Sequence, residues 1–293
     1  TYTQMLNSDG GIETDLTVIC LDKNYFRIIS SAATRERDKF HIKKHISSDI
    51  ELKDVTDDFC VFGLFGPKSR DLIKSLSNDN FENNDFKFAT AKFIYIEGIK
   101  IWIQRLSYVG ELGYELYVKF KDAKKIYELI VEVGKKFNLS NCGMHTMDVL
   151  RMESGFLHWG HDISPQENQY EAGLNFLISL KKNFDFIGKE SLLKIKDKKL
   201  NKRFIMLFLK KSKPGEPLIL HDEPIYLDNK IIGVTTSGNY SFNFNKNLSF
   251  GYIKSDYSNL ELSKKNLFIE IEKIKYPAEV LLNPLKQTDF KKM

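Results

Sequence analysis

Short segments rich in β-forming residues follow one another from residue 203 towards the end of the chain, and they constrain the fold more than any other feature. Turn residues separate these segments, and little helical pattern interrupts them. They are FIMLFL, PLILH, EPIYL, KIIGVTTSG, LSFGYI and LFIEIEKIKYPAEVLL. Short strands with this spacing are typical of a small barrel or sandwich. We therefore predict a separate all-β domain over residues 201–293.

The preceding residues, 1–200, mix strands and helices. Strands are expected in 16–30 around a turn at 22–24, in 59–65, in 92–106 with a turn at Glu97-Gly98, and in 114–120. Helical spacing of apolar residues and helix-end signals predict helices over 34–46, 66–76, 122–137 and 143–154. Hairpins in place of regular strand–helix alternation favour an α+β fold over a doubly wound sheet.

Charge and hydropathy exclude two classes of partner. The 293 residues include 44 basic and 39 acidic ones, but 37 of the basic residues are lysine. Arginine, the residue suited to bidentate contacts with phosphates and bases, is scarce, so no nucleic-acid partner is expected. No uncharged apolar run approaches the roughly 20 residues of a membrane helix. We expect a soluble protein without a membrane partner.

Three cysteines, Cys20, Cys60 and Cys142, are far apart in the sequence. An odd number without close spacing argues against a disulfide framework and a zinc site. Cys20 and Cys60 lie in apolar strand-like segments, where a free cysteine is usually buried. We expect a reducing compartment: the cytoplasm, or the mitochondrial matrix for a eukaryotic protein.

The segment LNSDGGIETDLTV carries the first candidate residue. Gly10 and Gly11 predict a tight turn, and Asp15 then stands at the start of an otherwise apolar strand. The pair of glycines is no phosphate loop, because no glycine-rich spacing or Lys-Ser/Thr follows. The alternative is an aspartate that simply marks a strand end.

The segment LSYVGELGYELYV carries the second candidate residue, Glu115. Glu115 lies between Tyr114 and Leu116 in an expected strand, although glutamate is a poor strand former. A half-buried carboxylate beside tyrosine rings can accept two parallel N–H groups from a flat heterocycle. The alternative is an exposed hairpin rim.

Histidines form the third group of candidates. His158, His161 and Asp162 cluster near Trp159, and a His/Asp cluster can serve acid–base chemistry. His41 and His45 have a metal-ligand spacing, but no third ligand is near, and we interpret them as surface residues. No metal site is predicted.

Ten short motifs along the chain resemble, in the same order, those of a known protein family. They are YTQMLNSDGGIETDLTV, GPKSR, SYVGELGYELYV, MDVLRMESG, HWGHDIS, YEAGLNF, FIGKESL, EPIY, GVTTSG and YPAEVL. The sequence resembles the folate-binding T-protein family of the glycine cleavage system. HWGHDIS and the E-T-D form of the first motif are similar to the tetrahydrofolate-dependent C-terminal half of dimethylglycine and sarcosine dehydrogenases.

The resemblance implies folate-binding lobes of mixed sheets and helices over 1–200, followed by a small C-terminal β-barrel. The chain does not begin with methionine. We expect an N-terminal truncation, since the family has a further stretch before the first motif and the dehydrogenases have a large flavin domain before that. FAD would belong to this upstream domain, and tetrahydrofolate to this chain.

The resemblance also implies site residues. The catalytic acid of the family falls on Asp15, and the residue that grips the pterin edge falls on Glu115. The other folate-binding positions fall on Tyr2, Ser31, Tyr108 and Tyr117. Arg151 and Glu153 match a helix motif of the family, and an ion pair that braces the helix stays as open as a folate role. His158 and His161 match by wording and are expected to be structural or to line a channel.

The implied function is capture of the carbon released from a dimethylglycine- or sarcosine-like methylamine as methylenetetrahydrofolate. The implied partners are folate, a methylamine-derived imine and an upstream FAD-binding oxidoreductase domain. Two alternatives are a free-standing T-protein-like aminomethyltransferase or demethylase, and a non-catalytic folate-binding module. The C-terminal QTDFKKM has lysines where the family usually has an arginine that meets the folate tail.

Overall fold

The computed structural model describes residues 1–286 and 289–292, so Gln287, Thr288 and Met293 of the C-terminal segment lie outside the described residues. The chain forms two compact units. The first comprises Thr1–His41 and Arg151–Leu285, and the second comprises Ile42–Leu150 with the C-terminal residues from Lys286. Within the described ranges, no helix combines the length and apolar character needed to cross a membrane. The predicted domain boundary at residue 200 stays a prediction.

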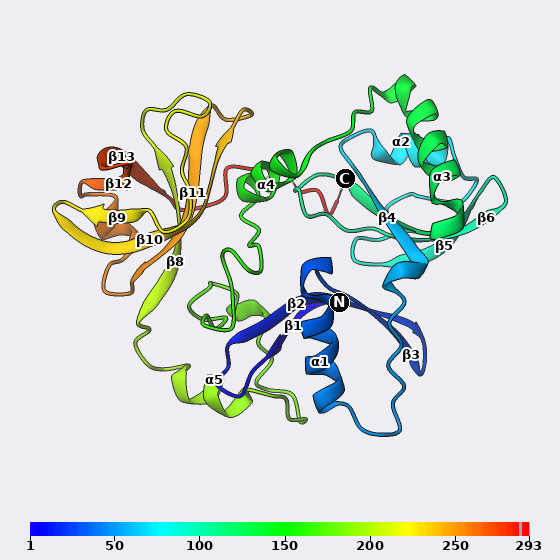
Figure 1. The fold of residues 1–293 in the computed structure, drawn as a ribbon, viewed down its shortest axis with the longest axis horizontal. Coiled ribbons are helices and arrows are strands. Elements are labelled where there is room, and N and C mark those ends of the chain that lie inside the picture. Colours follow the sequence, from blue (N-terminus) through cyan, green and yellow to red (C-terminus); the bar gives the residue numbers. More distant parts are fainter. Residues whose placement is uncertain (287–288, 293) are drawn as a thin grey trace. The chain divides into compact units, whose positions relative to one another are not determined.

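A closed barrel of six strands forms the C-terminal part of the first unit (Figure 1). Its strand order is β10-β11-β8-β13-β12-β9, and every neighbouring pair is antiparallel. The strands are β8 Lys202–Leu209, β9 Pro224–Leu227, β10 Lys230–Ser241, β11 Lys246–Lys254, β12 Leu267–Ile271 and β13 Ile274–Leu281. The prediction of a C-terminal barrel is confirmed.

The barrel interior follows from the two-residue periodicity of its strands. In β8, Ile205, Leu207 and Leu209 are buried and the residues between them are partly exposed. They pack with Ile225 and Ile269 in one hydrophobic cluster. Such alternation is what a closed sheet with an apolar interior requires. One short helix, α6 Asn259–Leu262, was not predicted, although Ser258 and Glu261 form a capping box at its start.

A three-stranded antiparallel sheet belongs to the same unit. Its strands are β1 Tyr2–Leu6, β2 Ile12–Asp22 and β3 Tyr25–Ile29, with β2 in the centre. Leu6 and Ile12 pack against Leu192 of helix α5 Lys189–Ile195 and against Phe250 of the barrel. The sheet and the barrel thus share a hydrophobic cluster.

The two glycines of the β1–β2 turn have different tasks. Gly10 adopts a φ of +85°, which is costly for residues with a side chain. The backbone of Gly11 lies close to that of Pro165. A Cβ atom at position 11 would come within 2.0 Å of the Pro165 carbonyl oxygen. The predicted turn is confirmed, and the second glycine is explained by this close approach.

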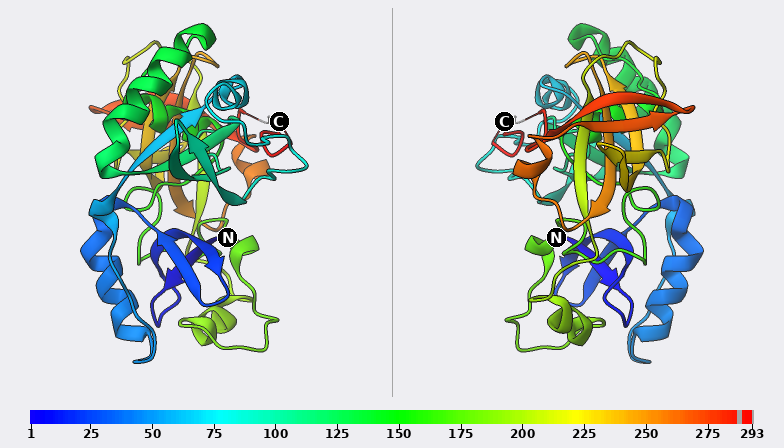
Figure 2. Two further views of the ribbon diagram at one scale, coloured as in Figure 1. Left: turned by 90° about the vertical axis from the view of Figure 1, so that its right-hand side faces the viewer. Right: turned by 90° about the vertical axis from the view of Figure 1, so that its left-hand side faces the viewer.

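The second unit is a four-stranded antiparallel sheet with helices on one face, visible also in Figure 2. Its order is β4-β7-β6-β5, from β4 Phe59–Phe65, β7 Gly113–Lys119, β6 Ile99–Gln104 and β5 Ala91–Ile96. Ile126 and Ile130 of α3 Phe120–Gly134, with Leu72 and Ile73 of α2 Ser69–Lys74, pack with sheet residues in one cluster. Glu97 and Gly98 both have positive φ, as expected for the predicted hairpin turn.

Two further helices agree with the sequence prediction. Helix α1 spans Arg35–His45, and helix α4 spans Met144–Glu153. Gly155, with a φ of +74°, follows the end of α4 as predicted.

The prediction that Cys20 is buried is wrong. Cys20 is exposed and Cys60 is only partly buried, and both are free thiols. Cys20 lies near the end of β2, opposite Phe26 of β3, a strand with no buried residue. Apolar neighbours in the sequence do not bury a thiol where the hairpin extends past the hydrophobic cluster.

Candidate functional site

Asp15 lies in the middle of the β1–β2 ladder. Its strand partner is Gln4, and Tyr2 lies two residues before Gln4 on the same face. Burial raises the pKa of Asp15 to about 6, while Tyr2 lowers it through a side-chain hydrogen bond and Gln4 lowers it more weakly. The Gln4 side chain is near enough to lower the pKa of Asp15 but does not reach normal hydrogen-bonding geometry. Both of its amide atoms lack a hydrogen-bond partner among the described residues.

The surroundings of Asp15 suit proton transfer. Its Oδ1 atom is buried and has no hydrogen-bond partner within the described part of the chain. A carboxyl group with a pKa near 6 is largely deprotonated at neutral pH and is still basic enough to accept a proton. Asp15 and Gln4 together therefore offer unused hydrogen-bonding atoms beside a basic carboxylate.

The residues before Asp15 are held by side chains from two other segments. The indole Nε1 of Trp159 donates a hydrogen bond of 3.0 Å to the Ile12 carbonyl. Arg37 forms an ion pair with Glu13 and lies over the Trp159 ring, 4.6 Å from its centroid. These contacts fix the backbone of β2 where Asp15 projects from it.

Glu115 and Tyr117 form a second polar group, on β7 of the second unit. The Tyr117 hydroxyl donates a hydrogen bond of 2.7 Å to Glu115 Oε2. Burial raises the pKa of Glu115, and the hydrogen bond from Tyr117 lowers it. Gln104 of β6 lies directly across the ladder from Glu115. Tyr108 is half-buried in the loop that joins β6 to β7.

Ser31 has a local task. It is exposed and precedes the 3₁₀ helix Ala32–Thr34, where its hydroxyl accepts a hydrogen bond of 3.3 Å from the Ala33 N–H. The structure therefore brings Tyr2 together with Asp15, and Tyr117 together with Glu115. The folate-binding roles of Tyr2, Ser31, Tyr108, Glu115 and Tyr117 stay predictions, as does the catalytic role of Asp15.

Arg151 and Glu153 fit the bracing interpretation that the sequence left open, but not as a pair with each other. Arg151 forms a fully buried ion pair with Asp162, and its Nη2 donates to Ser237 Oγ at 2.8 Å. Glu153 accepts hydrogen bonds from Ser241 Oγ at 2.6 Å and from Asn243 Nδ2 at 2.9 Å. The last turn of α4 is thereby fastened to the barrel through β10.

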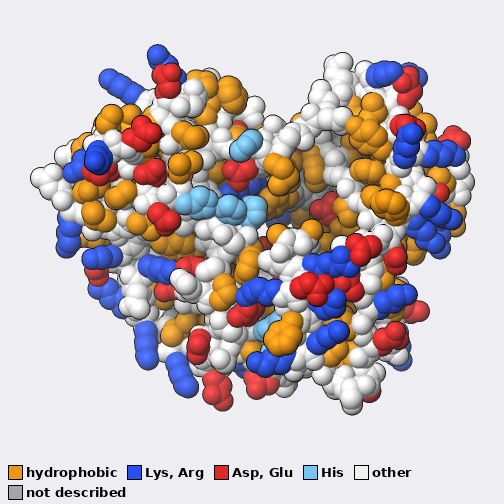
Figure 3. All heavy atoms as spheres, viewed as in Figure 1, with side chains coloured by type: hydrophobic (Ala, Val, Ile, Leu, Met, Phe, Trp, Pro, Cys, Tyr) orange, Lys and Arg blue, Asp and Glu red, His pale blue; other side chains and the backbone are white. Residues whose placement is uncertain are grey.

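Three imidazoles form a row on the surface, and Figure 3 shows histidine side chains next to one another there. His161 Nδ1 lies 2.9 Å from His221 Nε2, and the His158 and His161 ring centroids are 4.6 Å apart. The backbone N–H of His158 donates a hydrogen bond of 3.0 Å to Asp162 Oδ2. Among the described residues, no three potential metal ligands are grouped so that they could hold an ion.

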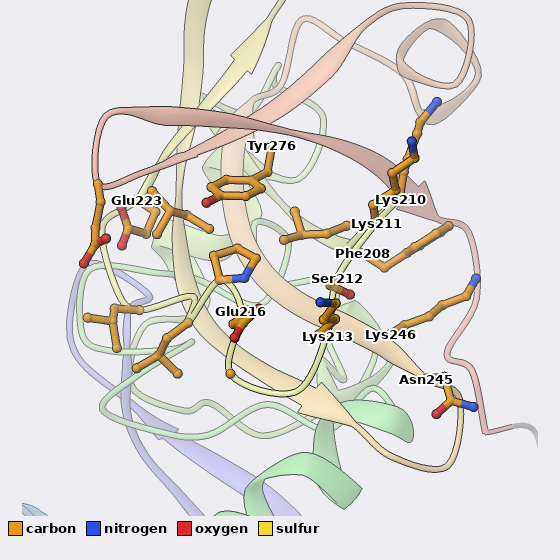
Figure 4. A pocket seen from close by; sticks show the side chains of 17 residues that line it. Phe208, Lys210, Lys211, Ser212, Lys213, Glu216, Glu223, Asn245, Lys246 and Tyr276 are labelled. Atoms are coloured by element: carbon orange, nitrogen blue, oxygen red, sulfur yellow. The ribbon is translucent and has the colours of Figure 1, made fainter.

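A pocket of about 1000 Å³ lies at the barrel, and none of the predicted site residues lines it. In Figure 4 lysines such as Lys210 and Lys246 lie at one side and Glu223 at the other. Lys210 is also paired with Glu279 at 3.1 Å. Side chains of both charge signs therefore line this pocket.

The chain thus has an α+β fold with a closed C-terminal barrel. Its two half-buried carboxylates, Asp15 and Glu115, lie on the two other sheets. Two family models match it: the GCVT N-terminal domain over residues 1–182, and the glycine cleavage T-protein C-terminal barrel domain over residues 202–286. The chain therefore belongs to the glycine cleavage T-protein family.

Relatives of two kinds are similar to this chain. Human mitochondrial dimethylglycine dehydrogenase is 32% identical over 98% of the chain, which spans 33% of that protein. The aminomethyltransferase of Halothermothrix orenii is 31% identical over 94% of the chain and 76% of its own length. The chain thus spans about a third of the dehydrogenases and three quarters of the aminomethyltransferases.

The fold agrees with this family. The crystal structure of the glycine cleavage system aminomethyltransferase T from Bartonella henselae superimposes with a TM-score of 0.82 at 21% identity, over 98% of this chain and 75% of that one. The predicted α+β fold with a T-protein-like arrangement is confirmed.

Proposed function

We propose that this chain is a tetrahydrofolate-dependent enzyme that captures a one-carbon unit from an oxidised methylamine and yields methylenetetrahydrofolate. The observation that carries the proposal is the Asp15 carboxyl group, whose pKa burial raises to about 6. Its Oδ1 is buried and has no partner among the described residues. Membership of an aminomethyltransferase-type family supports the proposal.

The second group of residues suits the folate ring. The pterin edge presents an amino group and a ring N–H side by side, and a carboxylate can accept both. Glu115, oriented by Tyr117, supplies such a carboxylate. When bound, tetrahydrofolate would supply the amine that takes up the one-carbon unit.

Asp15 has two tasks in this proposal. It accepts the proton that the attacking amine of tetrahydrofolate loses as the new N–C bond forms, and it returns a proton to the donor nitrogen, which leaves as the free amine when its own C–N bond breaks. Its negative charge stabilises the cationic carbon centre. Both tasks require the ionised carboxylate, which predominates above pH 6. Trp159 and Arg37 hold the strand that carries Asp15, so they act on its position and not on the reactants.

We further propose that the methylamine is dimethylglycine- or sarcosine-like and that an upstream FAD-containing domain oxidises it. The E-T-D and HWGHDIS motifs and the similarity to dimethylglycine dehydrogenase support this. The alternative is a chain that acts as a free-standing aminomethyltransferase or demethylase, and the similarity to aminomethyltransferases over three quarters of their length supports it.

The test is a coupled assay of methylenetetrahydrofolate with two variants. Tetrahydrofolate and the chain are supplied with a methylamine-derived imine, made in place by an added flavoprotein, and the rate without the chain is subtracted. Asp15→Asn is expected to abolish coupling, while Asp9→Asn, at an exposed aspartate of the same hairpin, keeps it. Unchanged coupling by Asp15→Asn would remove Asp15 as the base.

The same assay separates the two donors. A chain that uses the imine supports the dehydrogenase branch. A chain that uses only an aminomethyl donor supports the free-standing aminomethyltransferase, and a chain that binds tetrahydrofolate without turnover supports a non-catalytic module.

A further inference from the structure

Gln104 and Glu115 are neighbours across two strands of the second unit. The β6–β7 ladder pairs Gln104 with Glu115 and Trp102 with Tyr117. Directly opposed residues of an antiparallel pair share a face, with Cβ atoms about 4.5–5.5 Å apart. The side chains of Gln104 and Glu115 therefore leave neighbouring points on one face of the sheet.

This face of the sheet is not the one that packs the hydrophobic core of the unit. Ile103 and Leu116, the next residues along each strand, belong to the core cluster. Side chains alternate between faces along a strand, so Gln104, Glu115 and Tyr117 all lie on the opposite face.

The Gln104 amide has an unused donor. The side chain is only 2% exposed, and its Nε2 has no hydrogen-bond partner among the residues that the structure describes. A buried donor without an acceptor costs free energy, so such a group in a native protein calls for an explanation. A ligand with an acceptor at this place would supply the missing bond.

We propose that Gln104 is a further pterin-binding residue, whose Nε2 donates to the 4-oxo group while the Glu115 carboxylate accepts from the adjacent ring N–H and the 2-amino group. The inference rests on the proposed folate function. The pterin edge carries two donors followed by one acceptor. A carboxylate alone satisfies the donors and repels the 4-oxo oxygen, whereas an amide N–H₂ beside it completes the match.

The pairing sets specificity as well as affinity. A 4-amino analogue would place a donor against the Gln104 donor, and mismatched buried polar groups are strongly disfavoured. Gln104 therefore selects 4-oxo pterins over 2,4-diaminopteridines.

Gln104→Met tests the inference, because methionine has nearly the same length and no donor. Calorimetric titration with tetrahydrofolate is expected to show about tenfold weaker binding than the wild type, which corresponds to about 1.4 kcal/mol. The Tm of the ligand-free variant is expected to be unchanged or higher, since an unsatisfied buried donor has been removed. Wild type is expected to bind folic acid more tightly than aminopterin, its 4-amino analogue. The ratio of the two dissociation constants is expected to be several-fold smaller in the variant.

A matched control and the contrary results complete the test. Gln169→Met replaces another buried glutamine, 4% exposed, in the other compact unit, and is expected to leave affinity unchanged. Equal affinity of Gln104→Met and wild type would overturn the inference, as would a lower Tm with unchanged affinity, which marks a structural residue. A wild-type chain that binds no tetrahydrofolate would overturn the proposed function itself, and the inference with it.

Discussion

The Tyr117 hydroxyl donates a 2.7 Å hydrogen bond to Glu115, two residues earlier on the same face of β7. The bond uses one lone pair of Oε2 and leaves the carboxylate able to accept further donors. It also opposes the effect of burial, which raises the pKa of Glu115. Tyr117 thereby keeps Glu115 ionised over a wider pH range.

Tyr117→Phe is expected to weaken tetrahydrofolate binding. Without the hydrogen bond the pKa of Glu115 rises further, so the carboxyl group protonates at a higher pH and binding is lost at a higher pH than in the wild type. At neutral pH we expect a loss of about 3–10-fold. Calorimetric titrations over a pH series measure this. Tyr127→Phe, at an exposed tyrosine that contacts Asn141, is the control, and identical pH profiles for Tyr117→Phe and wild type would contradict the prediction.

Asp15→Asn is expected to stabilise the fold at neutral and higher pH. Because the folded-state pKa is raised from 3.8 to about 6, the folded chain binds this proton more tightly than the unfolded chain. The contribution of Asp15 to stability is therefore present below pH 4 and is lost as the pH rises through 6. The variant should gain on the order of 1–3 kcal/mol over wild type at pH 8 and little at pH 4. Urea unfolding at both pH values tests this, and a difference that does not change with pH would count against it.

Arg151→Met is expected to destabilise the chain strongly. It leaves Asp162, which is fully buried, without its cationic partner, and removing one member of a buried pair costs about 3–5 kcal/mol. Lys199→Met removes an exposed ion pair with Asp256 and should cost less than about 1 kcal/mol. Urea unfolding of both variants provides the comparison. Similar losses for the two would show that the buried pair does not fasten α4 to the barrel.

Trp159→Phe is expected to reduce one-carbon coupling more than tetrahydrofolate affinity. The change removes the N–H donor to Ile12 and keeps a ring under Arg37. We expect a stability loss of about 1 kcal/mol and a lower kcat, because β2 then holds Asp15 less firmly. Affinity measured by titration should stay within about threefold, since Glu115 lies on another sheet. A large loss of affinity with unchanged kcat would contradict the positioning role.

Most of the fold was predictable from local patterns. The strand Phe59–Phe65 and the turn at Glu97 and Gly98 agree with the prediction, because β-forming runs bounded by turn residues are strong local signals. Helices α5 and α6 were not predicted. Each is seven residues or shorter, so neither shows two full helical turns of apolar periodicity.

The candidate site was only partly predictable. Asp15 and Glu115 stand out because acids are unusual in apolar strands, and motifs carried their assignment. Gln4 and Gln104 carry no such signal, since a single polar residue in a strand is common on solvated faces. Only the registers that pair Gln4 with Asp15 and Gln104 with Glu115 show their relation to the carboxylates. Each register depends on the connection between two consecutive strands, and neither the bulge between Met5 and Leu6 nor the path of residues 105–112 follows from the polar and apolar pattern of the strands.

The central claim is that this chain binds tetrahydrofolate through Glu115, and calorimetric titration of the purified chain beside its Glu115→Ala variant tests it most directly. We predict saturable binding by the wild type and its loss in the variant, with circular dichroism spectra that show both chains folded. Absence of binding by a folded wild-type chain, or equal binding by the variant, would contradict the account.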